Sequence, residues 1–175
     1  MSPRRPVRFT AAAALAAALA LGMSCAEASD EDLIRELVEE AAARAEERDV
    51  EALGALFAAD YEDFEGRDAA GTVRLIADHL ARRRGVVVHV LGVRVGAVGT
   101  DGRAEVESEV ALSHGAAEML RRLVRLGGEY YRFRIEAIRV ASGEWRFAYA
   151  EWRAVGTVDL FPESLAVLRK LFPDL

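Results

Sequence analysis

The chain of 175 residues contains one cysteine, Cys25, and one lysine, Lys170. A single cysteine excludes an intramolecular disulfide, so a hydrophobic core has to stabilise the fold. Proline occurs 4 times, while 52% of the residues are hydrophobic and 30% are charged. This balance predicts one soluble domain with a substantial core, and it argues against a protein with many membrane spans.

Positive charge is also scarce, and the formal net charge is −6 at pH 7. Three arginines fall within the first ten residues, so removing residues 1–24 leaves 20 basic and 29 acidic residues, a net charge of −9. Phosphate backbones require clustered positive charge. We therefore expect no nucleic-acid partner.

Motifs for metals and cofactors are missing from the sequence. His79, His89 and His114 are far apart and lack ligand spacing, whereas a zinc site needs three or four converging ligands. The sequence also has no glycine-rich phosphate loop and no nucleophile elbow. We therefore expect neither a metal nor a cofactor.

The N-terminal segment has the order of a secretory signal. Met1 to Thr10 carries three arginines and no acid, and Ala11 to Gly22 is an unbroken run of alanine, leucine and glycine. This run is too short to span a bilayer stably. Residues 1–24 are therefore predicted to be a signal peptide for export to the cell envelope.

Cys25 directly follows this apolar run. Leu21-Gly22-Met23-Ser24-Cys25 resembles a bacterial lipobox, and the resemblance implies that Cys25 becomes the lipidated first residue of a membrane-anchored protein facing the periplasm. Lipoboxes usually have leucine at the place of Gly22. Ordinary cleavage after Ala28 stays open, since Ala26-Glu27-Ala28 fits the small-x-small rule, and it would give a soluble periplasmic or secreted protein.

The remaining chain predicts helices followed by strands. Helical spacing and capping residues predict helices at Asp30 to Arg48, after Asp49, from Asp68 to Gly85, and from Pro162 to Phe172. A short extended segment is expected at Asp60 to Glu65, and strands are expected at Val86 to Val95, Ala104 to Leu112, Tyr130 to Val140 and Trp145 to Val155. This order predicts an α+β fold, with a domain at 29–155 and a C-terminal helical tail at 156–175.

Several motifs carry a family resemblance over Asp30 to Val155. They are the long first helix, Leu56 to Tyr61 leading to Phe64-Glu65-Gly66, the helix from Gly71 to Leu80, and Gly143 to Phe147 with Glu151-Trp152. With them the chain resembles the nuclear transport factor 2-like superfamily, which includes SnoaL-like cyclases and ketosteroid isomerase. The resemblance implies a cone-shaped, curved antiparallel sheet wrapped around the N-terminal helices, with a pocket that serves as an active site, a ligand site or neither.

The same resemblance places Glu65 where the isomerases have a catalytic base. Those enzymes also use a tyrosine in the first helix, and this first helix contains none. The isomerase mechanism is therefore not supported, and Glu65 is better interpreted as a solvated loop acid.

Strand alternation predicts a second set of site residues. Trp145, Phe147, Tyr149 and Glu151 would share one face of the last strand, with Tyr131 and Phe133 on the same face of its neighbour. If this face is concave, the aromatic residues would bind a ligand, and Glu151 would be a base or a hydrogen-bonding anchor. Alternatively, Glu151 pairs with an arginine such as Arg153 at the rim.

The opposite faces are predicted to form a solvated outer surface. Glu105, Glu107 and Glu109 would lie there with Arg132 and Arg134, which weakens but does not exclude a homodimer through the sheet. Trp152 with Ala148 and Ala150 would be an apolar strip on this surface, able to seed an interface. Between the hairpins, a basic amphipathic helix from Ala116 to Leu126 would cover the cone or contact a membrane.

Three functions follow as hypotheses. The first is an exported, lipid-anchored domain that binds a small apolar ligand or a protein partner, without assigned catalysis. The second is an isomerase, dehydratase or cyclase that uses Glu65 or Glu151 as general base. The third is a structural envelope protein whose core is filled by side chains.

Overall fold

The structure is a computed structural model, and it describes residues 28–82, 86–114 and 129–171. Helix α2 (Asp30–Glu47) begins at a capping box in which the Ser29 side chain accepts from the Asp32 N–H, and Asp32 in turn accepts from the Ser29 N–H. Arg48 ends the helix with a left-handed φ of 60°. The predicted long first helix is confirmed.

Two shorter helices and one strand follow α2. Helix α3 (Val50–Gly54) is capped by Asp49, and helix α4 (Ala69–Ala81) is capped by Asp68, whose carboxylate accepts from the Gly71 N–H at 2.8 Å. Between them runs strand β1 (Phe57–Asp63), which begins three residues before the predicted extended segment.

Five strands form a single sheet in the order β1-β5-β4-β3-β2. The other strands are β2 (Val86–Val95), β3 (Arg103–His114), β4 (Glu129–Arg139) and β5 (Trp145–Val155). Strands β2 to β5 are antiparallel neighbours in chain order, whereas β1 pairs in parallel with β5. The predicted sheet is confirmed, with a parallel strand added at one edge.

A β-bulge in β5 changes which residues share a face. Ala137 of β4 pairs with Phe147, but the preceding residue Glu136 pairs with Tyr149, so Ala148 is an extra residue. Because side chains alternate along a strand, the extra residue moves every later side chain to the opposite face. A second bulge lies in β2, where Leu91 is the extra residue between Val90 and Gly92, and it likewise moves the later side chains of β2 to the opposite face.

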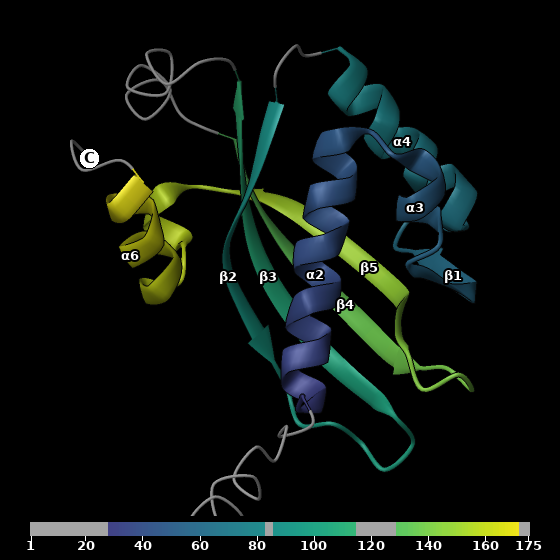
Figure 1. Ribbon diagram of the computed structural model, residues 1–175. Coiled ribbons are helices and arrows are strands. Elements are labelled where there is room, and N and C mark those ends of the chain that lie inside the picture. Colours follow the sequence, from purple (N-terminus) through teal and green to yellow (C-terminus); the bar gives the residue numbers. More distant parts are fainter. Residues whose placement is uncertain (1–27, 83–85, 115–128, 172–175) are drawn as a thin grey trace, which may run out of the picture.

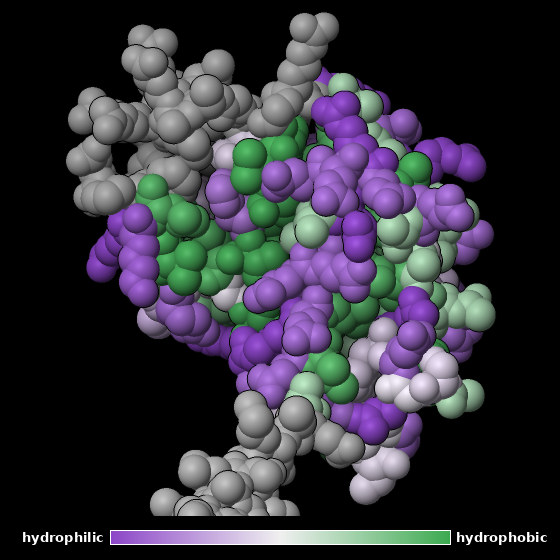
Figure 2. Space-filling model, in the orientation of Figure 1, coloured by the Kyte–Doolittle hydropathy of each residue, from purple (hydrophilic) through white to green (hydrophobic). Residues whose placement is uncertain are grey.

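The main core lies between the inner face of the sheet and α2, which crosses in front of the strands (Figure 1). Ile34, Val106 and Ala137 are each 0% exposed there. The exposed side of α2 is polar, and apolar residues are visible along β2 beside it (Figure 2). The space between α2 and the inner face of the sheet is thus filled by side chains.

The C-terminal segment packs on the outer face of the sheet. A turn at Thr157–Asp159 leads into helix α6 (Pro162–Leu171), which contributes Leu168 to a second core with Leu91 and Tyr130. Figure 1 shows α6 beside β2, on the other side of the sheet from α2. The predicted last helix is confirmed.

This packing corrects the prediction of a fully solvated outer face. Glu109 is 0% exposed, and its carboxylate accepts from Arg132 Nη2 at 2.5 Å and from the Phe161 N–H at 2.8 Å. The Arg132 and Arg94 guanidinium groups lie 4.3 and 3.5 Å from the centroid of the Phe161 ring. A buried charge is tolerated when it is paired and hydrogen-bonded, and Phe161, the residue before α6, supplies one of those hydrogen bonds.

Candidate functional site

Four aromatic rings form a connected row on the inner side of the sheet, which we call the aromatic strip. Tyr131 and Phe133 share a face of β4, Phe133 lies 6.1 Å from Trp152 of β5, and Trp152 lies 4.9 Å from Phe64 after β1. The Phe64 and Trp152 rings are nearly perpendicular, at 88°. The Phe64–Trp152 contact therefore has the edge-to-face geometry that aromatic side chains prefer, whereas the Phe133 and Trp152 rings are tilted at 35°.

The strip is the less covered part of this face. Farther along the same strands, Ile135, Ala137 and Phe147 are at most 7% exposed, whereas Tyr131, Phe133 and Trp152 are half-buried and Phe64 is 45% exposed. Half-covered aromatic rings beside a filled core are a common setting for an apolar ligand.

Two of the predicted ligand-binding residues lie in the core instead. Trp145 and Phe147 are each 5% exposed, and the Trp145 indole N–H donates to Asp30 at 3.4 Å. Trp152, which the sequence placed on the outer face, takes their expected place at the strip because the bulge at Ala148 turns it inward.

One end of the strip carries a polar cluster. Tyr131 donates its O–H to Glu129 at 3.2 Å, and His79 Nε2 of α4 lies 3.8 Å from the same carboxylate oxygen. The His79 and Tyr131 rings are 6.5 Å apart and perpendicular, at 89°. The structure therefore brings together Tyr131, a predicted site residue, with a histidine and a carboxylate that sequence spacing did not connect.

The other end carries a buried carboxylate, Asp63, at the end of β1. It is 2% exposed and accepts from the Glu65 and Arg67 N–H groups, from the Thr72 hydroxyl at 2.9 Å and from Arg67 Nε at 2.7 Å. Burial alone would raise the pKa of Asp63, but these four hydrogen bonds outweigh it and hold the pKa below its usual value. Asp63 is therefore a stable anion that organises the turn.

Arg67 connects this carboxylate to the aromatic strip. Its guanidinium carbon lies 5.7 Å from the centroid of the Trp152 ring and 6.0 Å from that of Phe64, within cation–π range. Burial would lower the pKa of Arg67, but its bonds to Asp63 and Glu65 raise it, so the group remains charged.

Glu65, a predicted catalytic residue, lies at this end of the strip. It is exposed, and its carboxylate pairs with Arg67. The family resemblance points to Glu65 and not to Asp63, which lies two residues earlier. The signal that could have found Asp63 was an acid at the buried end of β1 with Arg67 four residues later and Thr72 on the next helix.

Tyr149 and Glu151 lie on the outer face, so the prediction that they share the face of Phe147 is wrong. They pair across the sheet with Glu136 and Arg134, and Arg134 donates to Glu151 at 3.1 Å. Burial and the neighbouring Glu151 raise the pKa of Tyr149. The sequence predicts an arginine partner for Glu151 such as Arg153, and the arginine that the structure places against Glu151 is Arg134, on the neighbouring strand.

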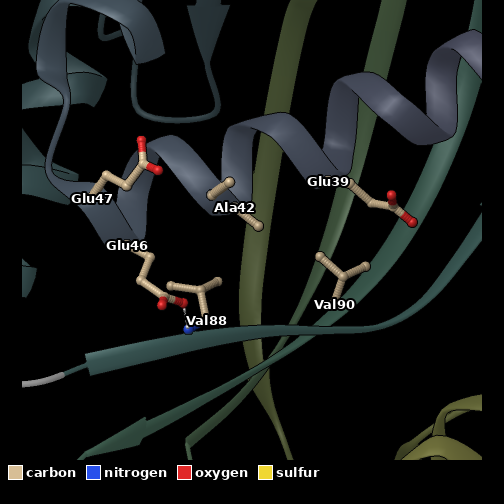
Figure 3. A pocket seen from close by; sticks show the side chains of 7 residues that line it. Glu39, Ala42, Glu46, Glu47, Val88 and Val90 are labelled. Carbon is tan, nitrogen blue, oxygen red and sulfur yellow. Dashed lines mark hydrogen bonds between the residues drawn. The ribbon is translucent and has the colours of Figure 1, made fainter.

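A separate groove of about 250 Å³ runs between α2 and the edge strand β2 (Figure 3). Its lining residues are Glu39, Ala42, Ala43, Glu46, Glu47, Val88 and Val90. Figure 3 shows the Glu46 carboxylate reaching the Val88 N–H, at 2.9 Å, while Glu47 points away from β2.

Within the described ranges, no group of three or more histidine, cysteine, aspartate or glutamate side chains is placed to hold a metal ion. No helix in this part of the chain is long and apolar enough to cross a membrane. The leader, Cys25 and the segment 116–126 lie outside the described residues, so their predicted roles stay predictions.

Comparison with known proteins identifies the fold. No family model matches the chain, and no curated protein matches it. Among solved structures, a nuclear transport factor 2-like protein with a cystatin-like fold from Novosphingobium aromaticivorans has 21% sequence identity and a TM-score of 0.56, over 90% of this chain and 96% of that one.

Two further structures give the same result. A nuclear transport factor 2-like protein of unknown function from Pseudomonas putida KT2440 has 19% identity and a TM-score of 0.55, covering 74% of this chain and 94% of that one. A candidate scytalone dehydratase from Novosphingobium aromaticivorans DSM 12444 also has 19% identity, with a TM-score of 0.56 over 70% and 82%. The chain therefore has the nuclear transport factor 2-like, cystatin-like fold that its sequence motifs resembled.

Proposed function

We propose that this domain binds a small apolar molecule at the aromatic strip. The observation that carries the proposal is the contrast along one sheet face, where Ile135, Ala137 and Phe147 are buried while Phe133 and Trp152 remain half covered. A ligand seated there would complete the burial of these rings, which is favourable by about 25 cal/mol per Å² of apolar surface.

The polar ends of the strip would orient the ligand. At one end lies the Arg67 guanidinium, which Asp63 and Glu65 hold in place, and at the other end Glu129 and Tyr131 supply hydrogen-bonding oxygens. A ligand with an aromatic or alicyclic body and an uncharged polar group near Arg67 fits this arrangement.

We also propose that the protein is exported and held in the cell envelope by lipid on Cys25, facing the periplasm. The support is the order of the leader, three arginines followed by an apolar run that ends just before the single cysteine. A membrane-anchored domain is well placed to take up apolar molecules that partition into the bilayer.

Native mass spectrometry tests the binding proposal. Wild-type protein, extracted gently from a bacterial envelope, is expected to carry a noncovalent small-molecule mass that organic solvent releases. Phe133→Trp, which enlarges a ring of the strip, should lower the occupancy about tenfold, as steric changes in apolar pockets do. Phe161→Leu changes an aromatic residue on the outer face and serves as the control. An adduct-free wild type, or equal occupancy in both variants, would rule out the strip.

A second candidate function is acid–base catalysis, which the His79–Glu129 pair favours. An imidazole beside a carboxylate is a common arrangement for proton transfer, and Glu65 near Arg67 offers another carboxylate at the strip. One structural neighbour is a candidate scytalone dehydratase. If the wild type converts the molecule that it binds, His79→Gln should lower kcat with little change in KM, and an unchanged kcat would remove His79 from the chemistry.

A further inference from the structure

Side chains of α2 close two points on the open edge of β2. Arg35 Nη1 donates to the Val93 carbonyl oxygen at 2.5 Å, and Glu46 accepts from the Val88 N–H at 2.9 Å. Arg35 and Glu46 are eleven residues apart, roughly 16 Å along a helix, which matches the five residues of strand from Val88 to Val93. The helix thus runs alongside the edge of β2, and its side chains occupy the backbone groups of Val88 and Val93.

Between these two points the edge is not closed. The helix presents Ala42 and Ala43 there, whose methyl groups are too short to reach the strand as Arg35 and Glu46 do. Since the Val88 N–H points away from β3, the alternation of the antiparallel ladder turns the N–H and C=O of Val90 the same way. The result is the groove of about 250 Å³ (Figure 3).

The groove is negatively charged above an apolar floor. Glu39 and Glu46 extend from α2 toward β2, and Val88 and Val90 form the floor (Figure 3). Glu39 makes no ion pair within the described part of the chain, whereas Glu47 is paired with Arg44 at 3.1 Å. Glu39 and Glu46 are seven residues apart, about 10 Å along the helix, so each carboxylate offers its own place for a positive charge above the apolar floor.

We propose that this groove docks a basic segment of a partner polypeptide, whose arginine or lysine side chains pair with Glu39 and Glu46. The aliphatic stems of such side chains would cover Val88 and Val90 while their charged ends reach the carboxylates. The groove is open and its acids are exposed, so it lacks the enclosure that holds a small free ligand. Charge complementarity makes the interaction sensitive to salt.

Solution NMR with a defined peptide tests this assignment. The probe is an acetylated and amidated peptide of alternating arginine and valine, and its comparison peptide has glutamine in place of arginine. We expect the arginine peptide to shift the amide signals of Val88 and Val90, and to bind several-fold more weakly at 0.5 M than at 0.05 M salt.

Two charge variants on the same helix give the control. Glu39→Lys should weaken binding about tenfold, whereas Glu36→Lys makes the same change of charge at an exposed position outside the groove and should have a much smaller effect. Equal loss in both variants, shifts that map elsewhere, or binding of free arginine as tight as that of the peptide would each overturn the proposal.

Discussion

At the scale of single residues, Asp63 shows how this domain keeps a charge in its interior. Its side chain accepts four hydrogen bonds, two of them from backbone N–H groups of the following turn. The same contacts fix Arg67 over the Trp152 ring. Asp63 therefore stabilises the fold and also positions one end of the aromatic strip.

Asp63→Asn is expected to lower the free energy of unfolding by about 3 kcal/mol at pH 7, since it removes the charge from a buried ion pair. Urea denaturation measures this directly. Glu62→Gln, an exposed neighbour on β1, is the control and should change stability by less than about 0.5 kcal/mol.

The difference in unfolding free energy between wild type and Asp63→Asn should depend on pH. The folded-state pKa of Asp63 lies below its unfolded value, so its stabilisation is fully present above about pH 4 and disappears as the pH falls through the folded pKa. The gap between wild type and Asp63→Asn should therefore narrow on acidification below pH 4. A gap that stays constant or widens would show that the charge of Asp63 is not what stabilises the turn.

Residue types in the sequence could predict part of this site. The aromatic residues of β4 and the acids after β1 were found, because strand alternation and the family resemblance point to them. Asp63 was missed because burial of an acid depends on Arg67 and Thr72 meeting it in space. His79 was set aside as a lone histidine, since its contact with Glu129 joins residues fifty positions apart.

At the scale of elements, the two bulges decide which side chains meet. Helices and strands were predicted within a few residues, because hydrophobic periodicity and capping residues are local signals. The bulge at Ala148 has no such signal, and it reversed the faces of Tyr149, Glu151 and Trp152. The bulge in β2 turns Leu91 outward into the core beneath α6.

Gly92 tests how closely α6 packs on β2. A Cβ atom at Gly92 would lie 2.6 Å from the Ser164 Oγ, so Gly92→Ala should lower the free energy of unfolding by about 1 to 2 kcal/mol. Because the Ser164 Oγ has no hydrogen-bond partner among the described residues, Ser164→Ala should be well tolerated.

The double variant Gly92→Ala/Ser164→Ala should recover part of the stability that Gly92→Ala loses. Removing the hydroxyl leaves the Ser164 Cβ 3.8 Å from the new methyl group, an ordinary contact. Thermal unfolding should therefore show the double variant to be more stable than Gly92→Ala alone. Additive losses would mean that α6 does not approach β2 as closely as described.

At the scale of the whole molecule, the sheet is covered on both faces by different parts of the chain. Helix α2 covers part of the inner face, and the C-terminal segment covers one corner of the outer face through Phe161, which bonds Glu109, and α6. From the sequence the C-terminal helix is expected only as a tail, since nothing local shows where an amphipathic helix docks. The aromatic strip lies on the inner side, away from α6.

The lipid anchor predicts where the protein resides in a cell. Wild-type protein should fractionate with membranes, and its intact mass should correspond to a chain beginning at Cys25 with added lipid. Cys25→Ser should move the protein to the soluble fraction without altering its folded domain. A wild-type chain beginning at Ser29 in the soluble fraction would contradict the anchor and leave ordinary export in its place.

The most direct test of ligand binding uses Trp152 as its own reporter. The chain has 2 tryptophans, so Trp145→Phe leaves Trp152 alone, and circular dichroism confirms that this variant is folded. Titration with the uncharged probe N-phenyl-1-naphthylamine should quench Trp152 emission in step with the rise of probe fluorescence, and Phe133→Trp in the wild-type background should weaken probe binding. Probe fluorescence that rises without quenching of Trp152, or no binding at all, would contradict a ligand site at the aromatic strip.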